Sequence, residues 1–274
     1  MRMLYGKKLA EGDLKKIKKK VKKEKLKLQL SIVQVGKNPS SESFIKQKEK
    51  ACKKAGIRFR IYQFPKGISQ KNLKKEVKKV VEDPKNSGIV IQLPLPKNID
   101  AKEILDLVPF KKDVDVLSSE SWEKFLKGRL LIFPPVVCAV AKICKQYKIK
   151  IKRKKVVLVG RGKLVGKPLA VWIKRKKGKL TIVHSSTRNI SSFTKKADIL
   201  ISGTGKPNLI KGDMIKKGSV IIDCGTSSQK TKTKGDVDFK SVSKKAGFIT
   251  PVPGGIGPLT VTCLIENLVK LNNR

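Results

Sequence analysis

Histidine is almost missing from this chain of 274 residues, and cysteine is scarce. His184 is the only histidine, and none of the five cysteines stands in a C-x-x-C pair. Because zinc sites are built from closely spaced cysteine and histidine ligands, we predict no metal site. An odd number of cysteines without a disulfide framework also indicates free thiols in a reducing compartment, which predicts a cytoplasmic protein.

The chain also lacks a long apolar run. The longest, residues 130–141, holds 12 residues and is interrupted by Pro134 and Pro135. A membrane-spanning helix needs about 20 predominantly apolar residues. The first residues, MRMLYGKKLAEG, contain no apolar signal region. We therefore predict that the protein has no membrane partner.

Acidic residues are few: 21 Asp and Glu stand against 65 Lys and Arg, which gives a formal net charge of +44. Such a charge favours binding to nucleic acid or another polyanion. It is also typical of a composition that fills every solvated helix face with lysine. The lysines run from Lys7 to Lys270 without one dominant block, and aromatic residues make up only 5%. This even spread favours the second interpretation, with no specific nucleic-acid partner.

Short apolar runs alternate with segments of helical periodicity along the whole chain. Alternation of this kind predicts right-handed βαβ units and parallel sheets, the α/β class, with a soft boundary near residues 118–130. Strands are predicted at residues 28–35, 57–64 and 88–93, then at 156–159, 180–184, 199–202, 220–224 and 248–250. Helices are predicted at residues 7–24, 39–56, 70–81, 101–108, 135–147 and 261–271, with a polar connector at 111–120 and a loop at 226–234.

The stretch KVVLVGRGKLVGKP, residues 155–168, reads as a buried strand, a tight glycine turn and a helix that begins near Pro168. Free N–H groups at such a helix start attract an anion. The spacing G-x-G-x-x-x-G is one residue longer than the usual dinucleotide fingerprint, and a turn of this kind also occurs without any ligand.

The strand after this turn ends in HSSTR, residues 184–188, with no acidic residue. Proteins that bind NAD place a carboxylate there, on the ribose hydroxyls. Its absence, together with Arg161 in the glycine turn, favours the 2′-phosphate of NADP. The alternative is that Arg161 and Arg188 are ordinary surface charges.

Polar side chains in the first half fall where the strands end. Phe44 and Lys48 are one helical turn apart, Gln92 ends the third strand, and Asp113 and Asp115 follow on the connector. Ligands of parallel sheets bind at this edge, and such a set would suit a flat, nitrogen-rich substrate. Spacing alone nevertheless favours an ordinary interpretation, with Phe44 in the core, Lys48 in solvent and Gln92 capping a strand.

Several stretches stand together in the order of one known family. They are GIVIQLPLP (88–96), KDVD (112–115), VLVGRGKLVGKP (157–168), HSST (184–187), IIDCG (221–225), GDV (235–237) and TPVPGGIGPLT (250–260). The chain resembles the bifunctional methylenetetrahydrofolate dehydrogenase/cyclohydrolases from about residue 30 to residue 270. QLPLP and PVPGGIGP are the specific motifs, whereas the glycine turn is common to many dehydrogenases.

The resemblance implies two domains around a cleft, in a homodimer. Residues 1–125, completed by a C-terminal helix at 258–274, would be the folate-binding catalytic domain, and residues 126–257 a Rossmann-like NADP-binding domain. The enzyme would oxidise 5,10-methylenetetrahydrofolate with NADP⁺ and hydrolyse the methenyl product to 10-formyltetrahydrofolate. These reactions belong to one-carbon metabolism and supply purine biosynthesis.

The resemblance also implies roles for individual residues. Lys48 matches the family's catalytic lysine, Gln92 the glutamine that positions it, and Asp115 the aspartate that holds the pterin. Phe44 stands where the family usually has tyrosine. Further substrate contacts would be Ile91, Leu93, Pro253, Gly254 and Gly255. The cofactor contacts would be Gly160, Arg161, Gly162, Ser185 and Thr226.

The chain departs from the family pattern at a few positions. Besides Phe44, Gly162 replaces a common serine and Val116 replaces the usual glycine after the aspartate. Residues 132–137, IFPPVV, stand where P-C-T-P is frequent. Two other classes remain as alternatives. One is a different NAD(P) dehydrogenase acting on amino or keto acids, against which the QLPLP motif argues. The other is a nucleic-acid binder that has lost activity, against which the even spread of charge argues.

Overall fold

The computed structural model describes residues 1–229 and 232–273 and contains two compact units. The first unit consists of Glu11–Pro135 and Val261–Arg274, and the second of Met1–Ala10 and Val136–Thr260. Each unit has its own parallel sheet covered by helices, which confirms the predicted α/β fold in two parts. The limits 1–125 and 126–257 of the functional domains stay predictions.

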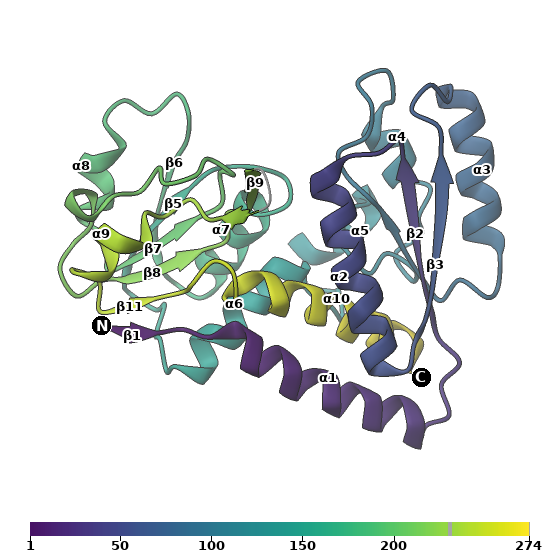
Figure 1. Ribbon diagram of the computed structural model, residues 1–274, viewed down its shortest axis with the longest axis horizontal. Helices are drawn as coiled ribbons and strands as arrows, with labels where there is room; N and C mark the ends of the chain where they lie inside the picture. The colour runs from purple at the N-terminus through teal and green to yellow at the C-terminus, as the bar shows by residue number, and fades with distance from the viewer. Residues whose placement is uncertain (230–231, 274) are drawn as a thin grey trace. The chain divides into compact units, whose positions relative to one another are not determined.

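The first unit contains a three-stranded parallel sheet of order β3-β2-β4 (Figure 1). Successive residues of the central strand β2 face opposite sides: Leu30 and Ile32 pack into one apolar cluster, and Val33 and Val35 into another. Both faces are therefore buried, as expected of a parallel sheet. The strands are β2 (Gln29–Val35), β3 (Arg58–Phe64) and β4 (Gly88–Ile91).

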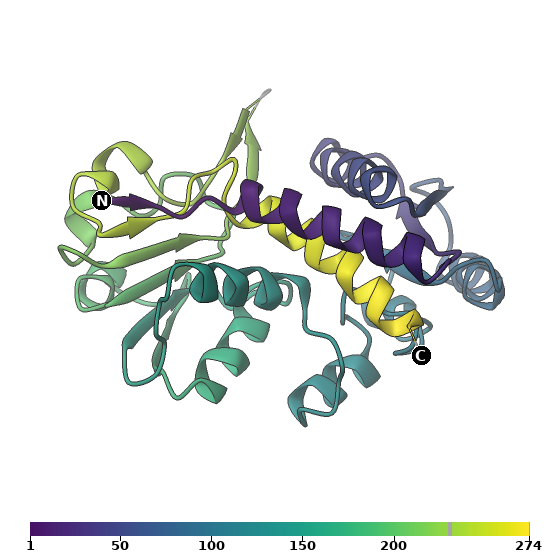
Figure 2. The ribbon, with the colours of Figure 1, turned by 90° about the horizontal axis from the view of Figure 1, so that it is seen from below.

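Helices cover the two faces of this sheet. One face carries the buried residues of α1, α2 and α10, and Figure 2 shows α1 and α10 running side by side. The other face carries α3 and α4. The helices of this unit are α1 (Gly6–Lys23, from Glu11 on), α2 (Pro39–Ala55), α3 (Gln70–Glu82), α4 (Ala101–Leu105), α5 (Ser119–Leu126) and α10 (Ile256–Asn272, from Val261 on).

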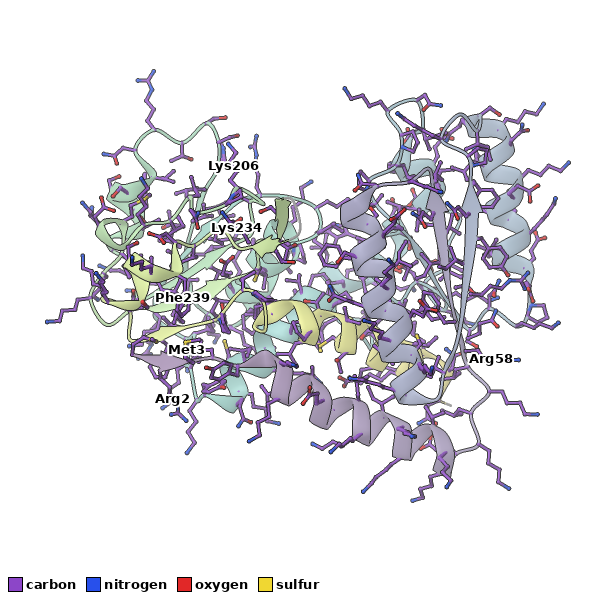
Figure 3. All side chains as sticks on the ribbon, viewed as in Figure 1. Arg2, Met3, Arg58, Lys206, Lys234 and Phe239 are labelled. Atoms are coloured by element: carbon purple, nitrogen blue, oxygen red, sulfur yellow. The ribbon has the colours of Figure 1, made fainter. Side chains whose placement is uncertain are left out.

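Lysine occupies the solvated faces of these helices. In α1, Leu14, Ile17 and Val21 are buried, whereas the lysines between them are exposed or half-exposed. Figure 3 shows such nitrogen-tipped side chains projecting outward from elements of both units. The positive charge thus follows from amphipathic helices whose polar positions are lysine.

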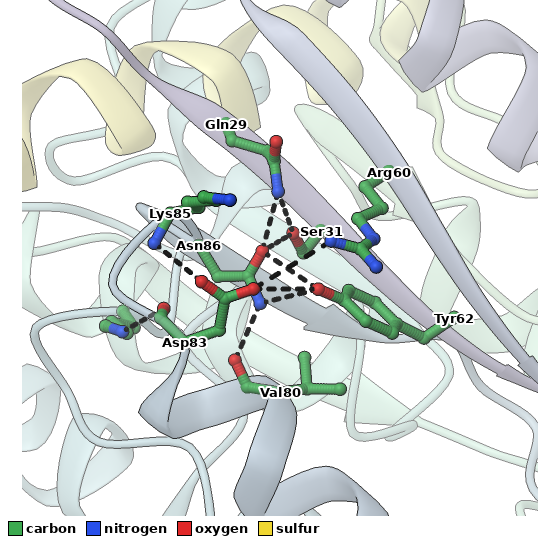
Figure 4. Close-up of polar contacts among 9 residues, drawn as sticks. Gln29, Ser31, Arg60, Tyr62, Val80, Asp83, Lys85 and Asn86 are labelled. Carbon is green, nitrogen blue, oxygen red and sulfur yellow. Dashed lines mark hydrogen bonds and ion pairs between the residues drawn. The ribbon is translucent and has the colours of Figure 1, made fainter.

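A buried polar network closes the amino end of the first sheet (Figure 4). Asn86, fully buried, accepts hydrogen bonds from Gln29 Nε2 at 2.7 Å and Ser31 Oγ at 2.6 Å, and its own Nδ2 donates to Val80 O at 2.7 Å and to Tyr62 Oη at 3.0 Å. Because its hydrogen-bonding groups are satisfied within the fold, this end is structural.

The second unit contains a six-stranded, wholly parallel sheet of order β1-β11-β8-β7-β5-β6. Its strands are β1 (Arg2–Met3), β5 (Lys155–Val159), β6 (Lys179–Val183), β7 (Ile199–Ser202), β8 (Val220–Asp223) and β11 (Phe248–Ile249). Its helices are α6 (Pro135–Gln146, from Val136 on), α7 (Gly166–Arg175), α8 (Ile190–Thr194) and α9 (Phe239–Ser243), with a short 3₁₀ turn η1 (Gly212–Met214).

Two sequence predictions were wrong. Residues 226–234, predicted as a loop, contain the antiparallel strands β9 (Ser227–Gln229) and β10 (Lys232–Lys234), while residues 230 and 231 lie outside the described part. The connector at 111–120 ends in α5, because Ser118 Oγ accepts from Ser121 N at 3.3 Å and caps that helix. Strand β1 was not anticipated at all.

A search of the helices within residues 1–229 and 232–273 finds none long and apolar enough to cross a membrane.

Asn267 attaches the C-terminal helix to the first unit. Its side chain is 1% exposed, and its Nδ2 donates to Val114 O at 2.9 Å and to Phe133 O at 2.8 Å. The hydrogen bond to Val114 ties α10 to the chain just before Asp115.

We expect Asn267→Ala to destabilise the protein by about 2–3 kcal/mol in equilibrium urea unfolding, because two carbonyl groups lose their donor in a buried place. Asn272→Ala is the matched control, since Asn272 also donates to two carbonyls but is partly exposed, so that water can replace it. Equal losses for the two variants would contradict this assignment.

Candidate functional site

Lys48 and Gln92 meet at the carboxyl edge of the first sheet. Lys48 lies on α2 and is 8% exposed, and its Nζ donates to Gln92 Oε1 at 2.8 Å. Gln92 follows β4, where its backbone N–H donates to Val33 O at 2.8 Å and its Nε2 to Leu93 O at 2.9 Å. These two bonds fix the amide so that its oxygen faces the lysine.

The buried Lys48 amine loses its proton more readily than the amine of a surface lysine. Burial lowers the pKa of Lys48 below its ordinary value, and the charge of Asp115 and the Cys52 thiol oppose this shift. Burial is the larger of the two effects that could lower this pKa, the other being a nearby cation.

Asp115 lies close enough to Lys48 for the two groups to influence each other. Burial raises the pKa of the Asp115 carboxyl to about 6, the Lys48 charge lowers it, and Asp113 raises it. Asp113 itself is buried and holds the loop: its Oδ2 accepts from Leu117 N, Ser118 N and Ser118 Oγ at 2.8–2.9 Å. The spacing in the sequence predicted both aspartates as site residues, but it did not show that Asp113 holds the loop while Asp115 lies near Lys48.

The backbone at Val116 explains one departure from the family pattern. Its φ is 59°, in the left-handed region that glycine adopts freely and a β-branched residue does not. Its side chain is 2% exposed. The valine therefore strains the backbone directly after Asp115 but adds buried apolar surface there.

The other predicted substrate contacts of the first unit differ in accessibility. Phe44 is partly buried on α2, one turn before Lys48. Ile91 is 3% exposed within an apolar cluster, so only its backbone could face a ligand. Leu93 is partly exposed, and its carbonyl accepts from Ser41 Oγ at 3.4 Å.

In the second unit, the turn between β5 and α7 is closely packed at two of its three glycines. A Cβ at Gly166 would overlap the carbonyl oxygen of Gly160, and one at Gly160, whose φ is 106°, would lie 2.8 Å from Gly203 O. A Cβ at Gly162, by contrast, would meet nothing within 4 Å. Arg161 is exposed beside it. The turn is a cradle of backbone atoms with an arginine at its rim, which fits a phosphate group.

The strand β6 ends in a tight turn. His184 N donates to Thr187 Oγ1 at 3.0 Å, and Thr187 N returns a bond to His184 O at 2.8 Å. This turn presents Ser185 to solvent. Thr226 follows β8 at the same carboxyl edge of the sheet and is partly exposed.

Residues 253–255 also lie in the second unit. The carbonyl of Gly254 accepts from Gly6 N and Lys7 N at 3.0 Å, and a Cβ at Gly6 would overlap the carbonyl of Gly255. Pro253 is exposed next to them. The structure thus brings Lys48, Gln92 and Asp115 together in the first unit, and it holds Pro253, Gly254 and Gly255 against the start of the chain in the second.

A parallel sheet whose β5–α7 turn is a close-packed glycine cradle is typical of the nucleotide-binding half of two-domain NAD(P)-dependent dehydrogenases. The comparisons make this specific. Residues 134–274 match the NAD(P)-binding domain of tetrahydrofolate dehydrogenase/cyclohydrolase, and residues 4–115 match the catalytic domain of the same enzymes. The chain belongs to the tetrahydrofolate dehydrogenase/cyclohydrolase family, and the predicted family and enzyme class are confirmed.

Individual relatives match this chain over nearly its full length. The bifunctional protein FolD of Nautilia profundicola is 41% identical over 98% of this chain and 96% of its own length. The crystal structure of the FolD enzyme from Campylobacter jejuni superimposes with a TM-score of 0.94 at 34% identity, covering 100% of this chain and 99% of that one. The Trypanosoma brucei enzyme, solved with NADP and an inhibitor, gives a TM-score of 0.91 at 31% identity over 97% of this chain and 95% of that one.

We expect Gly162→Ser to fold with an unchanged midpoint of thermal unfolding, because the added side chain meets open space. Gly166→Ser should lower the free energy of unfolding by about 2 kcal/mol or more, because the overlapped atoms are backbone and cannot move aside. Thermal unfolding of both variants tests this pair. Equal stability of the two variants would contradict the close packing of the turn.

Proposed function

We propose that this protein oxidises 5,10-methylenetetrahydrofolate with NADP⁺ and hydrolyses the methenyl product to 10-formyltetrahydrofolate. The observation that carries the hydrolytic half is the buried hydrogen bond between Lys48 Nζ and Gln92 Oε1 at 2.8 Å. An amine with a lowered pKa can exist as the free base near neutral pH, which a proton-transfer catalyst requires.

In the hydrolytic reaction, water adds to the methenyl carbon, which carries the positive charge. Lys48 as the neutral amine takes one proton from the attacking water. The adduct then loses its hydroxyl proton as the carbonyl forms, the bond from that carbon to N5 breaks, and N5 receives a proton. One proton is released to solvent overall. Lys48 can act as base and then as acid, because its pKa is held below that of a surface lysine.

The neighbours of Lys48 would act on its orientation and on the substrate. Gln92 holds the amine without adding a negative charge, so it does not favour the protonated form as a carboxylate would. Asp115, which is partly exposed, would accept from the amino and ring N–H groups of the pterin. Phe44 would stack on the ring but brings no hydroxyl, so it would contribute no hydrogen bond to the ligand.

The glycine turn of the second unit would bind the cofactor. The close-packed backbone at Gly160 and Gly166 would receive the pyrophosphate, and Arg161, Ser185 and Thr226 would contact the adenosine side. Bound NADP⁺ supplies the hydride acceptor. The chain's own residues bind and align the two ligands, and this half needs no residue that carries a proton.

We also propose a homodimer in the cytoplasm, engaged in one-carbon supply for purine biosynthesis and without a specific nucleic-acid partner. Strand β6 lies at the edge of the six-stranded sheet and exposes Ile182 and Thr181. An uncovered parallel edge with an exposed isoleucine is a surface that a second copy can cover.

Lys48→Met tests the hydrolytic role. We expect hydrolysis of methenyltetrahydrofolate to fall by about 10²–10⁴-fold, because the proton carrier is lost, while part of the NADP-dependent oxidation remains. The matched control is Lys46→Met, since Lys46 lies on the same helix but is exposed. The assignment fails if Lys48→Met and Lys46→Met hydrolyse the substrate at the same rate.

Arg161→Ala tests the choice of cofactor. An arginine paired with a phosphate forms a charge-assisted contact, so its loss should raise KM for NADP⁺ about tenfold and KM for NAD⁺ little. Lys163→Ala, a second exposed cation in the same turn, controls for a general loss of positive charge. Similar effects on the two cofactors would refute the 2′-phosphate role of Arg161.

A further inference from the structure

The second unit buries two carboxylates side by side. Asp223 ends β8 and is 2% exposed, and Asp236 follows β10 and is 1% exposed. Their hydrogen-bond partners in the described part of the chain are N–H and O–H groups, with no lysine or arginine among them. Burying two adjacent acidic side chains without a cation is unfavourable for the free energy of folding, so such a pair is a candidate for a functional role.

Asp223 uses both carboxylate oxygens on the backbone around it. Its Oδ1 accepts from Gly225 N at 2.9 Å and from Asp236 N at 3.2 Å, and its Oδ2 accepts from Val237 N at 3.0 Å. Burial raises the pKa of Asp223 to about 7, and Asp236 acts in the same direction. Asp223 therefore holds the segment that carries Asp236.

Asp236 reaches across to another strand. Its Oδ2 accepts from Ser202 Oγ at 2.7 Å and from Thr204 N at 2.6 Å, at the carboxyl end of β7. The residues it holds touch the cofactor turn directly. A Cβ at Gly160 would lie 2.8 Å from Gly203 O and 3.4 Å from Thr204 Cγ2. A shift of the loop after β7 would therefore also displace the backbone of the glycine turn at Gly160.

The other carboxyl oxygen of Asp236, Oδ1, differs from Oδ2 in its hydrogen bonding. Within the described residues, Oδ1 is buried and has no hydrogen-bond partner. A Cβ at Gly225 would overlap it, so the glycine backbone covers it. Since no donor faces Oδ1, an amide nitrogen could occupy that position, and the two contacts of Oδ2 do not require a charge there. Asp223 lacks this freedom, because donors face both of its oxygens.

We propose that Asp236 is a positioning residue for the cofactor: by holding Ser202 and Thr204 it fixes the loop after β7 against Gly160, and so keeps the glycine turn in the form that receives the pyrophosphate. This rests on the proposed NADP-dependent function. Asp236 touches neither ligand and acts through the backbone of the loop that it anchors.

Titration calorimetry of NADP⁺ against the full-length protein tests this role. Asp236→Ala should raise Kd for NADP⁺ roughly tenfold, the loss expected when the two buried hydrogen bonds to Ser202 and Thr204 disappear. Asp236→Asn should stay within about threefold of the unmodified protein, because its oxygen still accepts from Ser202 and Thr204. The hydrolysis of methenyltetrahydrofolate, which uses no NADP, should be unchanged in both variants. A purely structural role would instead reduce hydrolysis and binding together.

The role is refuted if Asp236→Ala binds NADP⁺ as tightly as the unmodified protein, or if Asp236→Asn is as weak as Asp236→Ala. Should Asp236→Ala fail to fold, Ser202→Ala removes one of the two donors with little change in volume; weaker NADP⁺ binding then supports the role and unchanged binding overturns it. If the unmodified protein does not oxidise methylenetetrahydrofolate, the proposed function is refuted. The role of Asp236 is then still decided by comparing Kd of each variant with Kd of the unmodified protein, measured with whichever of NADP⁺ and NAD⁺ binds.

Discussion

The chemistry that we propose for the first unit depends on burying one amine, that of Lys48, without pairing it with a carboxylate. Lys48 is the one lysine that is buried among those whose side chains the structure describes. Burying an ammonium is unfavourable unless it is hydrogen-bonded, and pairing it with a carboxylate would hold its proton. Gln92 resolves this conflict, because an amide oxygen satisfies the amine in both of its protonation states. Asp115 lies near enough to restrain the fall in pKa but is itself half-protonated near pH 6.

The fold places this pair by ordinary sheet geometry. Strands β2 and β4 run parallel, so Gln92 after β4 and the start of α2 after β2 reach the same edge. At the opposite edge lies the network around Asn86, whose side chain makes its hydrogen bonds within the fold (Figure 4). In the proposed mechanism one end of the sheet thus contributes stability and the other carries the chemistry.

The sequence predicts the main strands and helices because their apolar periodicity is strong, as in Leu14, Ile17 and Val21 of α1. It misses elements that depend on distant partners. The two residues of β1 pair with Phe248 and Ile249, far along the chain, and β9 and β10 are short and polar, so no apolar pattern marks them. The long helix α10 begins five residues before the predicted Val261 because Ile256 is already buried.

The site was only partly accessible to sequence reasoning, for a related reason. The spacing of Phe44 and Lys48 predicts a shared helix face, but whether Lys48 is buried depends on the sheet and loop around it, so spacing alone favoured a solvated lysine. The family resemblance implied site roles for Lys48 and Gln92, and the structure shows that Lys48 is buried and hydrogen-bonded to Gln92. The resemblance assigned nothing to Asp236, because an aspartate after a glycine reads as a turn residue until its contact with Thr204 is seen.

The charges of the two units show why net charge says little about the chemistry of this protein. Its surplus of 44 positive charges lies mainly on solvated helix faces, where each lysine is screened and contributes little. Inside the fold the pattern is reversed: the buried cation Lys48 has an uncharged hydrogen-bond partner, and the buried acids Asp223 and Asp236 have backbone and hydroxyl donors. In both places the hydrogen-bond partner of the buried group is neutral. Burial is accordingly the largest cause of the lowered pKa of Lys48 and of the raised pKa of Asp223. The exposed lysines are not among the causes named for either group.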